Sequence, residues 1–157
     1  MQKIKKPMQK LHFSIKINAP KKKVWRKMLS DASYRVWTKP FMEGSYFEGS
    51  WDKGAKIRFL AKDENGKLSG MTSMIEENIP YEFISIKHLG IVNNGVDDTT
   101  IDEVRKWAGA HENYAFKETG GKTEVLVDTD TDEEFIKMFE EMWPKALAKL
   151  KEISEKN

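Results

Sequence analysis

The sequence contains no cysteine, so disulfide bonds, thiolate metal sites and cysteine nucleophiles are excluded. It also lacks a run of about 18 apolar residues, the length that a transmembrane helix requires, and we expect no membrane span. The N-terminal residues 1–10 are basic, but no apolar stretch follows them as it would in a secretory signal. These absences together predict a cytoplasmic protein.

Histidine is scarce, and its placement does not form a common metal motif. None of His12, His88 and His111 has a second histidine or a carboxylate three or four residues away on a predicted helix. We expect His12 and His88 on strand surfaces. A glycine-rich phosphate loop and a G-x-S-x-G motif are missing as well. The sequence therefore predicts no metal, no cofactor and no catalytic constellation.

The charges are nearly balanced overall but unevenly distributed. The formal net charge is +2, yet residues 1–27 hold ten Lys or Arg and no acidic residue. Acidic residues collect at 97–103 and 128–134. A basic arm for nucleic acid or an acidic partner is one interpretation, and a solvated surface is the other. We favour the solvated surface and expect no nucleic-acid partner, because arginine, the residue preferred for phosphate and base recognition, is scarce.

The strongest periodic pattern lies at residues 131–153. Thr131 and Glu134 form a capping box, which predicts that a helix begins there. A helix of about 23 residues is roughly 35 Å long, and its wide apolar face has to be buried against a sheet. Apolar residues recur at steps of three and four, at Phe135, Met138, Phe139, Met142, Trp143, Ala146, Leu147, Leu150 and Ile153.

The rest of the chain reads as one strand, two short helices and a series of strands, and we expect residues 1–157 to form a single domain with a core at about 9–153. Short turns such as Asn65-Gly66 predict antiparallel neighbours. Residues 90–110 are predicted as an inserted loop and short helix, capped by Thr100 and Glu103. The predicted strands cover residues 11–17, 46–51, 55–62, 68–78, 83–89, 111–118 and 123–130, and the two helices lie between Pro20 and Pro40.

Several short motifs, in this order and spacing, resemble the SRPBCC superfamily of helix-grip proteins. It includes START-like domains, Bet v 1-like allergens, polyketide cyclases and homologues of the activator of heat-shock protein 90 ATPase, to which the resemblance is greatest. The resemblance implies an α+β fold with a strongly curved antiparallel sheet of about six to seven strands around the C-terminal helix. The motifs are Ile17-Asn18-Ala19-Pro20 with Val24-Trp25, Trp37 with Pro40-Phe41, Phe47 to Trp51 with Gly54, Glu76 to Pro80, Gly120 to Thr123, and Trp143 with Leu147.

The same resemblance implies a cavity between the concave face of the sheet and the long helix. Methionine and aromatic residues at inward positions suit an adaptable apolar pocket, although they also suit a filled core. Trp107 lies on the inserted helix, which would form either a lid over the pocket or a surface helix docked against the sheet. The candidate ligand-binding residues are Trp37, Phe41, Trp51, Phe59, Met71, Trp107, Tyr114, Phe116, Met138, Met142 and Trp143.

Three functions are considered from the sequence, and we predict the first, with the other two as alternatives. The first is a binding module for a hydrophobic small molecule, such as a lipid, a sterol-like compound or an aromatic compound. The second is a co-chaperone-like partner domain that binds a chaperone, as the resemblance implies. The third is an enzyme of the cyclase or aromatase kind, in which one acid or base acts inside the pocket. The candidate acids and bases are Glu43, Glu48, Asp52, Glu76 and His88.

Overall fold

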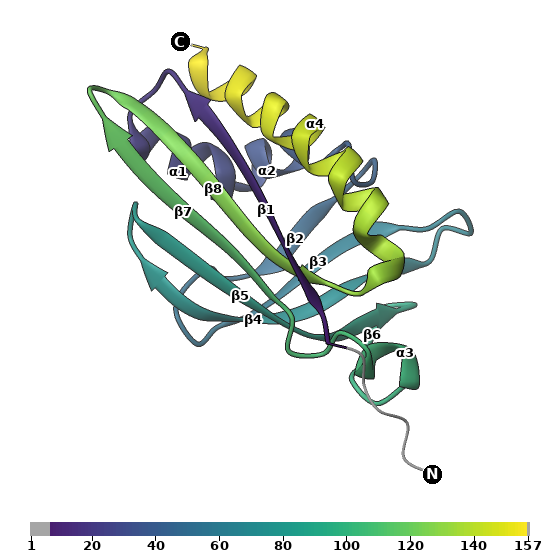
Figure 1. The fold of residues 1–157 in the computed structure, drawn as a ribbon. Coiled ribbons are helices and arrows are strands. Elements are labelled where there is room, and N and C mark those ends of the chain that lie inside the picture. The colour runs from purple at the N-terminus through teal and green to yellow at the C-terminus, as the bar shows by residue number, and fades with distance from the viewer. Residues whose placement is uncertain (1–6, 157) are drawn as a thin grey trace.

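The C-terminal helix α4 (Ile136–Glu155) lies across the concave side of one curved antiparallel sheet (Figure 1). The computed structural model describes residues 7–156. The strands are β1 (Gln9–Ile17), β2 (Tyr46–Gly49), β3 (Lys56–Lys62), β4 (Leu68–Ile79), β5 (Phe83–Asn93), β6 (Val96–Asp98), β7 (His111–Thr119) and β8 (Lys122–Thr131). The helices before α4 are α1 (Lys21–Leu29), α2 (Asp31–Trp37), α3 (Asp102–Arg105) and the 3-10 turn η1 (Glu133–Phe135).

Seven of the eight strands run in the order β1-β8-β7-β5-β4-β3-β2, and the eighth, β6, pairs with the end of β5. The strands β1 and β2 form the two edges, so the sheet stays open and bends around α4. The α+β helix-grip fold that the resemblance implied is confirmed. No helix within residues 7–156 is long and apolar enough to cross a membrane.

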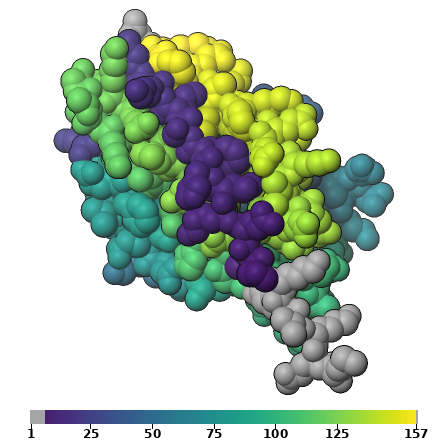
Figure 2. Space-filling view, viewed as in Figure 1, coloured from purple at the N-terminus to yellow at the C-terminus, as the bar shows by residue number. Residues whose placement is uncertain are grey.

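Alternation of side chains explains how the central strands bury one face. In β8, every second residue from Thr123 to Thr131 is buried. The register of β1 against β8 places Phe13 opposite Val127 and Ile15 opposite Val125, so both strands direct apolar side chains to the same face. In the space-filling view, β1 and α4 meet along their length (Figure 2), and together they cover this side of the core.

The long helix begins later than the capping box predicts. Thr131 is the last residue of β8 and pairs with Gln9. The cap is Asp132, whose carboxylate accepts a hydrogen bond of 2.9 Å from the backbone N–H of Glu133. The first turn is the 3-10 turn η1, and α4 follows from Ile136. The strand ladder therefore holds Thr131, and Asp132 caps the 3-10 turn that leads into the helix.

The segment 90–110 also differs from its prediction as a loop and a capped helix. The strand β5 continues to Asn93, and a tight turn at Asn94 and Gly95 leads into β6. Both turn residues have positive φ angles, 51° and 80°, as a primed hairpin turn requires. The side chain of Asp98 binds the backbone N–H and the hydroxyl of Thr100, both at 2.9 Å. Thr100 is thus part of this turn, and it does not cap α3.

An ion-pair network centred on Asp97 attaches β6 to the neighbouring strands. Its Oδ1 accepts hydrogen bonds from Arg58 Nε at 2.8 Å and from Arg58 Nη2 at 2.6 Å. Its Oδ2 accepts a bond of 3.0 Å from Thr72 Oγ1 and pairs with Lys56 Nζ. Lys56, followed by the other donors, holds the pKa of Asp97 at about 2, below its ordinary value. The network favours the ionised carboxylate in the folded state.

We expect Asp97→Asn to lower the free energy of unfolding at pH 7 by about 2 kcal/mol, since one unit of pKa corresponds to about 1.4 kcal/mol. The folded pKa lies below the unfolded one, so this contribution is present above the unfolded pKa and is lost as the pH falls towards about 2. Urea denaturation at pH 7 and pH 3 measures the difference. Asp102→Asn is the control, because that side chain is 94% exposed on the same segment. A loss for Asp97→Asn that is equal at both pH values would contradict the expectation.

Candidate ligand site

Aromatic side chains from the strands and from the helices meet between the sheet and α4. Trp143 on α4 lies 4.9 Å from Phe41 and 6.0 Å from Tyr114, measured between ring centroids. Tyr34 on α2 lies 5.2 Å from Phe47 on β2. These ring contacts connect α2, β2, β3, β7 and α4 into one group. We call it the aromatic cluster, and it consists of Tyr34, Trp37, Phe41, Phe47, Trp51, Phe59, Tyr114 and Trp143.

A chain of hydrogen-bonded polar side chains, Ser73, His88, Glu112 and Tyr114, is set into the same concave face. Ser73 Oγ lies 2.7 Å from His88 Nδ1, and His88 Nε2 lies 3.2 Å from Glu112 Oε1. The hydroxyl of Tyr114 donates to the other carboxylate oxygen of Glu112. Pairing places these residues together, because Ser73 faces His88 across β4 and β5 while Glu112 pairs with Ile86 across β5 and β7. We call these four residues the polar chain.

The polar chain is largely buried. Ser73 is 0% exposed, His88 5% and Tyr114 1%, and the Glu112 side chain is 20% exposed. In the tautomer with the proton on Nε2, His88 donates a hydrogen bond to Glu112, and its Nδ1 accepts a hydrogen bond from the Ser73 hydroxyl, so one proton arrangement satisfies every bond. In this arrangement Glu112 accepts hydrogen bonds from two donors, and His88 donates one hydrogen bond and accepts one. The polar groups therefore order one another inside an apolar environment.

The two tyrosines next to Glu112 remain protonated. Burial raises the pKa of the Tyr114 hydroxyl well above its ordinary value, and the negative charge of Glu112 raises it further. Burial also raises the pKa of Tyr34, again with a contribution from Glu112. Both phenols consequently act as hydrogen-bond donors at any physiological pH.

Two buried polar atoms beside the aromatic cluster have no partner within residues 7–156, Trp51 Nε1 and Asn78 Oδ1. The amide nitrogen of Asn78 is occupied, because Nδ2 donates to the backbone carbonyl of Trp51 at 2.8 Å. The Trp51 ring lies 5.3 Å from Phe47 and 5.8 Å from Phe59. A buried donor without an acceptor costs about 1–3 kcal/mol. The site thus presents one free donor and one free acceptor at the edge of the cluster.

The structure brings six of the eleven candidate ligand-binding residues into the aromatic cluster, namely Trp37, Phe41, Trp51, Phe59, Tyr114 and Trp143. Met71, opposite Phe59 in the ladder, and Met142 are half-buried. Phe116 is buried against Trp25 of α1, at 5.2 Å. Met138 is 42% exposed on α4. Trp107 is half-buried in the segment after α3 and makes no ring contact with the cluster in the described part of the chain.

Four of the five candidate acids and bases lie at the surface. Glu43, Glu48, Asp52 and Glu76 are all exposed. The expectation that His88 lies on a strand surface is wrong, because His88 continues the inward series of Ile84 and Ile86 on β5. His12 is exposed, as predicted.

Sequence reasoning missed the carboxylate at the centre of the site, Glu112, and its neighbour Ser73. A signal was present in each strand. Glu112 lies two residues before Tyr114 and Ser73 two residues before Ile75, so each occupies an inward position in an alternating pattern. A polar residue at such a position is either buried with partners or marks a site.

Known structures resemble this fold closely, at low sequence identity. The Aha1 dimer from Colwellia psychrerythraea shares 19% identity over 94% of this chain and 97% of that chain, with a TM-score of 0.69. The protein ChR145 from Cytophaga hutchinsonii shares 17% identity over 96% of each chain, with a TM-score of 0.69. DynU16 from the dynemicin biosynthetic locus shares 12% identity over 93% of this chain but 47% of that chain, with a TM-score of 0.68.

Sequence comparison identifies one family. A search of curated proteins finds no match. Residues 18–155 match the family described as Activator of Hsp90 ATPase homolog 1-like protein. This match extends from the end of β1 to the last turn of α4, so it includes the aromatic cluster and the polar chain. The chain belongs to the family of Activator of Hsp90 ATPase homolog 1-like proteins.

Proposed function

We propose that this protein is a binding module for a hydrophobic small molecule with an aromatic body and a polar group. The observation that carries the proposal is the polar chain set into the aromatic cluster, with the free indole N–H of Trp51 beside it. A core that serves only stability gains little from a buried carboxylate, because desolvating that group offsets its hydrogen bonds. Pockets for small molecules combine apolar walls with a few convergent polar groups, and the aromatic cluster and the polar chain supply these two kinds of group.

The free polar atoms indicate how such a molecule would be oriented. A carbonyl or ether oxygen of the ligand would accept a hydrogen bond from Trp51 Nε1, and a ligand hydroxyl would donate to Asn78 Oδ1. Flat rings pack against the edges and faces of the cluster better than a flexible acyl chain does. We therefore favour an aromatic ligand over a lipid. The likeness to DynU16 of the dynemicin biosynthetic locus concerns the fold alone and does not specify the ligand.

Native mass spectrometry of the protein purified from cells, followed by titration with the released compound, tests the proposal. We expect Trp51→Phe, which keeps an aromatic ring and removes the N–H, to weaken binding about three- to tenfold, the value of one hydrogen bond. Trp25→Phe is the matched control, because Trp25 contacts Tyr81 and Phe116 outside the aromatic cluster. If no compound copurifies and no aromatic probe binds the interior, the proposal fails. Equal weakening by both variants would contradict the role of Trp51.

Family membership supports a second candidate, a partner domain of the chaperone-activator type. A chaperone ATPase assay with and without the protein tests it, and an unchanged rate would exclude it.

A further inference from the structure

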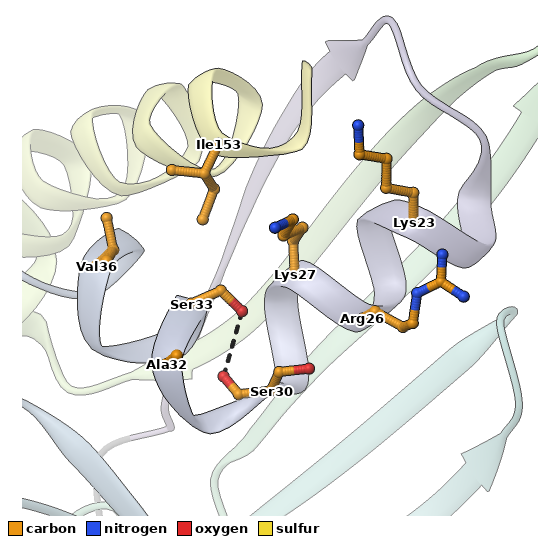
Figure 3. A pocket seen from close by; sticks show the side chains of 8 residues that line it. All are labelled: Lys23, Arg26, Lys27, Ser30, Ala32, Ser33, Val36 and Ile153. Carbon is orange, nitrogen blue, oxygen red and sulfur yellow. Dashed lines mark hydrogen bonds between the residues drawn. The ribbon is translucent and has the colours of Figure 1, made fainter. Parts of the chain in front are cut away.

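A surface groove of about 640 Å³ lies between α1, α2 and the C-terminal end of α4 (Figure 3). It is separate from the aromatic cluster and shares no residue with it. Its volume falls within the range of about 300–1,000 Å³ that is usual for ligand pockets. The residues that line it are Lys23, Arg26, Lys27, Ser30, Ala32, Ser33, Val36 and Ile153.

The two sides of the groove differ in chemistry. The α1 side carries three cations, Lys23, Arg26 and Lys27. Val36 of α2 and Ile153 of α4 extend their side chains into the space between these two helices, as Figure 3 shows, and they are the apolar floor of the groove. Both apolar residues are half-buried, so they lie in the hollow and do not project from the surface. The groove therefore has a basic wall next to a small apolar floor.

The positive charge of the wall is not neutralised by the protein. Within residues 7–156, no carboxylate lies within 4.0 Å of Arg26 or Lys27, and Lys23 donates to a backbone carbonyl, that of Lys156. The neighbouring acidic side chains are engaged elsewhere. Asp31 pairs with Arg35 at 3.2 Å, and Glu152 lies 3.4 Å from Lys149. Anionic groups of a partner would therefore gain attraction in the groove without displacing an internal pair.

We propose that this groove binds a short acidic segment of a protein partner that inserts one apolar side chain between Val36 and Ile153. Complementary charge selects the acidic segment, and the apolar floor selects a peptide over a simple polyanion. Nucleic acid is disfavoured because the groove has no aromatic residue on which a base would stack. A membrane surface is disfavoured because the apolar groups are recessed, whereas lipid-binding faces project theirs. The inference does not depend on ligand binding in the interior.

Fluorescence anisotropy with a short labelled peptide of Asp and Glu that carries one central Leu tests the proposal. We expect the double variant Arg26→Glu with Lys27→Glu to bind the peptide at least about tenfold more weakly, because attraction becomes repulsion. Both residues lack ion-pair partners among the residues that the structure describes, so the fold should persist, and circular dichroism checks this. The matched control is Lys16→Glu with Lys137→Glu, which changes the net charge equally at exposed positions of β1 and α4. The control should bind like the natural protein.

A peptide with Ser in place of Leu separates the groove from general charge attraction. We expect it to bind several-fold more weakly to the natural protein, and the variant Val36→Asp should remove this difference. Equal binding of the Leu and Ser peptides, or equal loss in the two charge-reversed variants, would overturn the proposal. Tighter binding to mixed phosphatidylcholine and phosphatidylserine vesicles, or to duplex DNA, than to the peptide would also overturn it.

Discussion

Replacing Trp143 by alanine is expected to lower the free energy of unfolding by about 3–5 kcal/mol, the usual cost of deleting a buried aromatic side chain. Trp143 is 3% exposed and joins α4 to the rest of the core. Its ring lies 6.1 Å from Phe13 on β1, 5.9 Å from Trp37 on α2 and 6.0 Å from Tyr114 on β7. Removing it therefore opens a cavity where three elements meet the helix. Because small domains have about 5–15 kcal/mol of stability, this single change would remove much of it.

Guanidinium denaturation followed by far-ultraviolet circular dichroism measures this effect, since tryptophan fluorescence changes with the substitution itself. Met138→Ala provides the control on the same helix, because Met138 is 42% exposed, and we expect it to cost less than about 1 kcal/mol. Trp143→Phe should fall between the two, since a smaller ring keeps part of the packing. Similar losses for Trp143→Ala and Met138→Ala would show that α4 does not depend on this contact.

The architecture was largely predictable because the periodic patterns are strong. The three- and four-residue steps in 135–153 identify α4, and its buried residues include Ala146, Leu147 and Leu150 from that stripe. The resemblance to helix-grip proteins supplied what periodicity does not contain, namely that the sheet wraps around the helix. The order of the strands depends on pairings far apart in sequence, such as β1 with β8, and no local pattern reveals these.

Local chemistry was less predictable where two signals competed. Asn94-Gly95 is as strong a hairpin signal as Asn65-Gly66, but the three-residue strand β6 that follows it is too short to show alternation. Thr131 carries a capping signal and also lies in an alternating strand, and the strand prevailed. In both places, the outcome was decided by pairing with a distant strand.

The candidate site was predictable only in its apolar part. Aromatic residues such as Trp37 and Trp143 were expected inside, and the structure joins them in one cluster. The polar chain was not predicted, because two of its three hydrogen bonds join residues 15 and 24 positions apart on different strands. A single serine, histidine or glutamate in a strand gives no spacing from which its partners follow. Only the register of β4, β5 and β7 brings them together.

Replacing Glu112 by alanine is expected to cost about 2–4 kcal/mol, because it leaves two buried donors, the Tyr114 hydroxyl and His88 Nε2–H, without an acceptor. Glu112→Gln should cost less, since its amide oxygen still accepts one of these bonds. Chemical denaturation at neutral pH measures both. A loss that is equal in the two variants would contradict this expectation, because it would mean that the amide oxygen of Gln does not replace the carboxylate as an acceptor.

A double-mutant cycle separates the hydrogen bond from the volume of the side chain. In the Glu112→Ala variant, Tyr114→Phe should be nearly neutral, because the hydroxyl that it removes has already lost its acceptor. In the natural protein the same change leaves Glu112 with one donor fewer and should cost about 1 kcal/mol or more. Additive losses would mean that the two side chains act independently, and the polar chain would then be a set of separate contacts. Strong coupling would show that it acts as one unit, as a preorganised site for the polar end of a ligand requires.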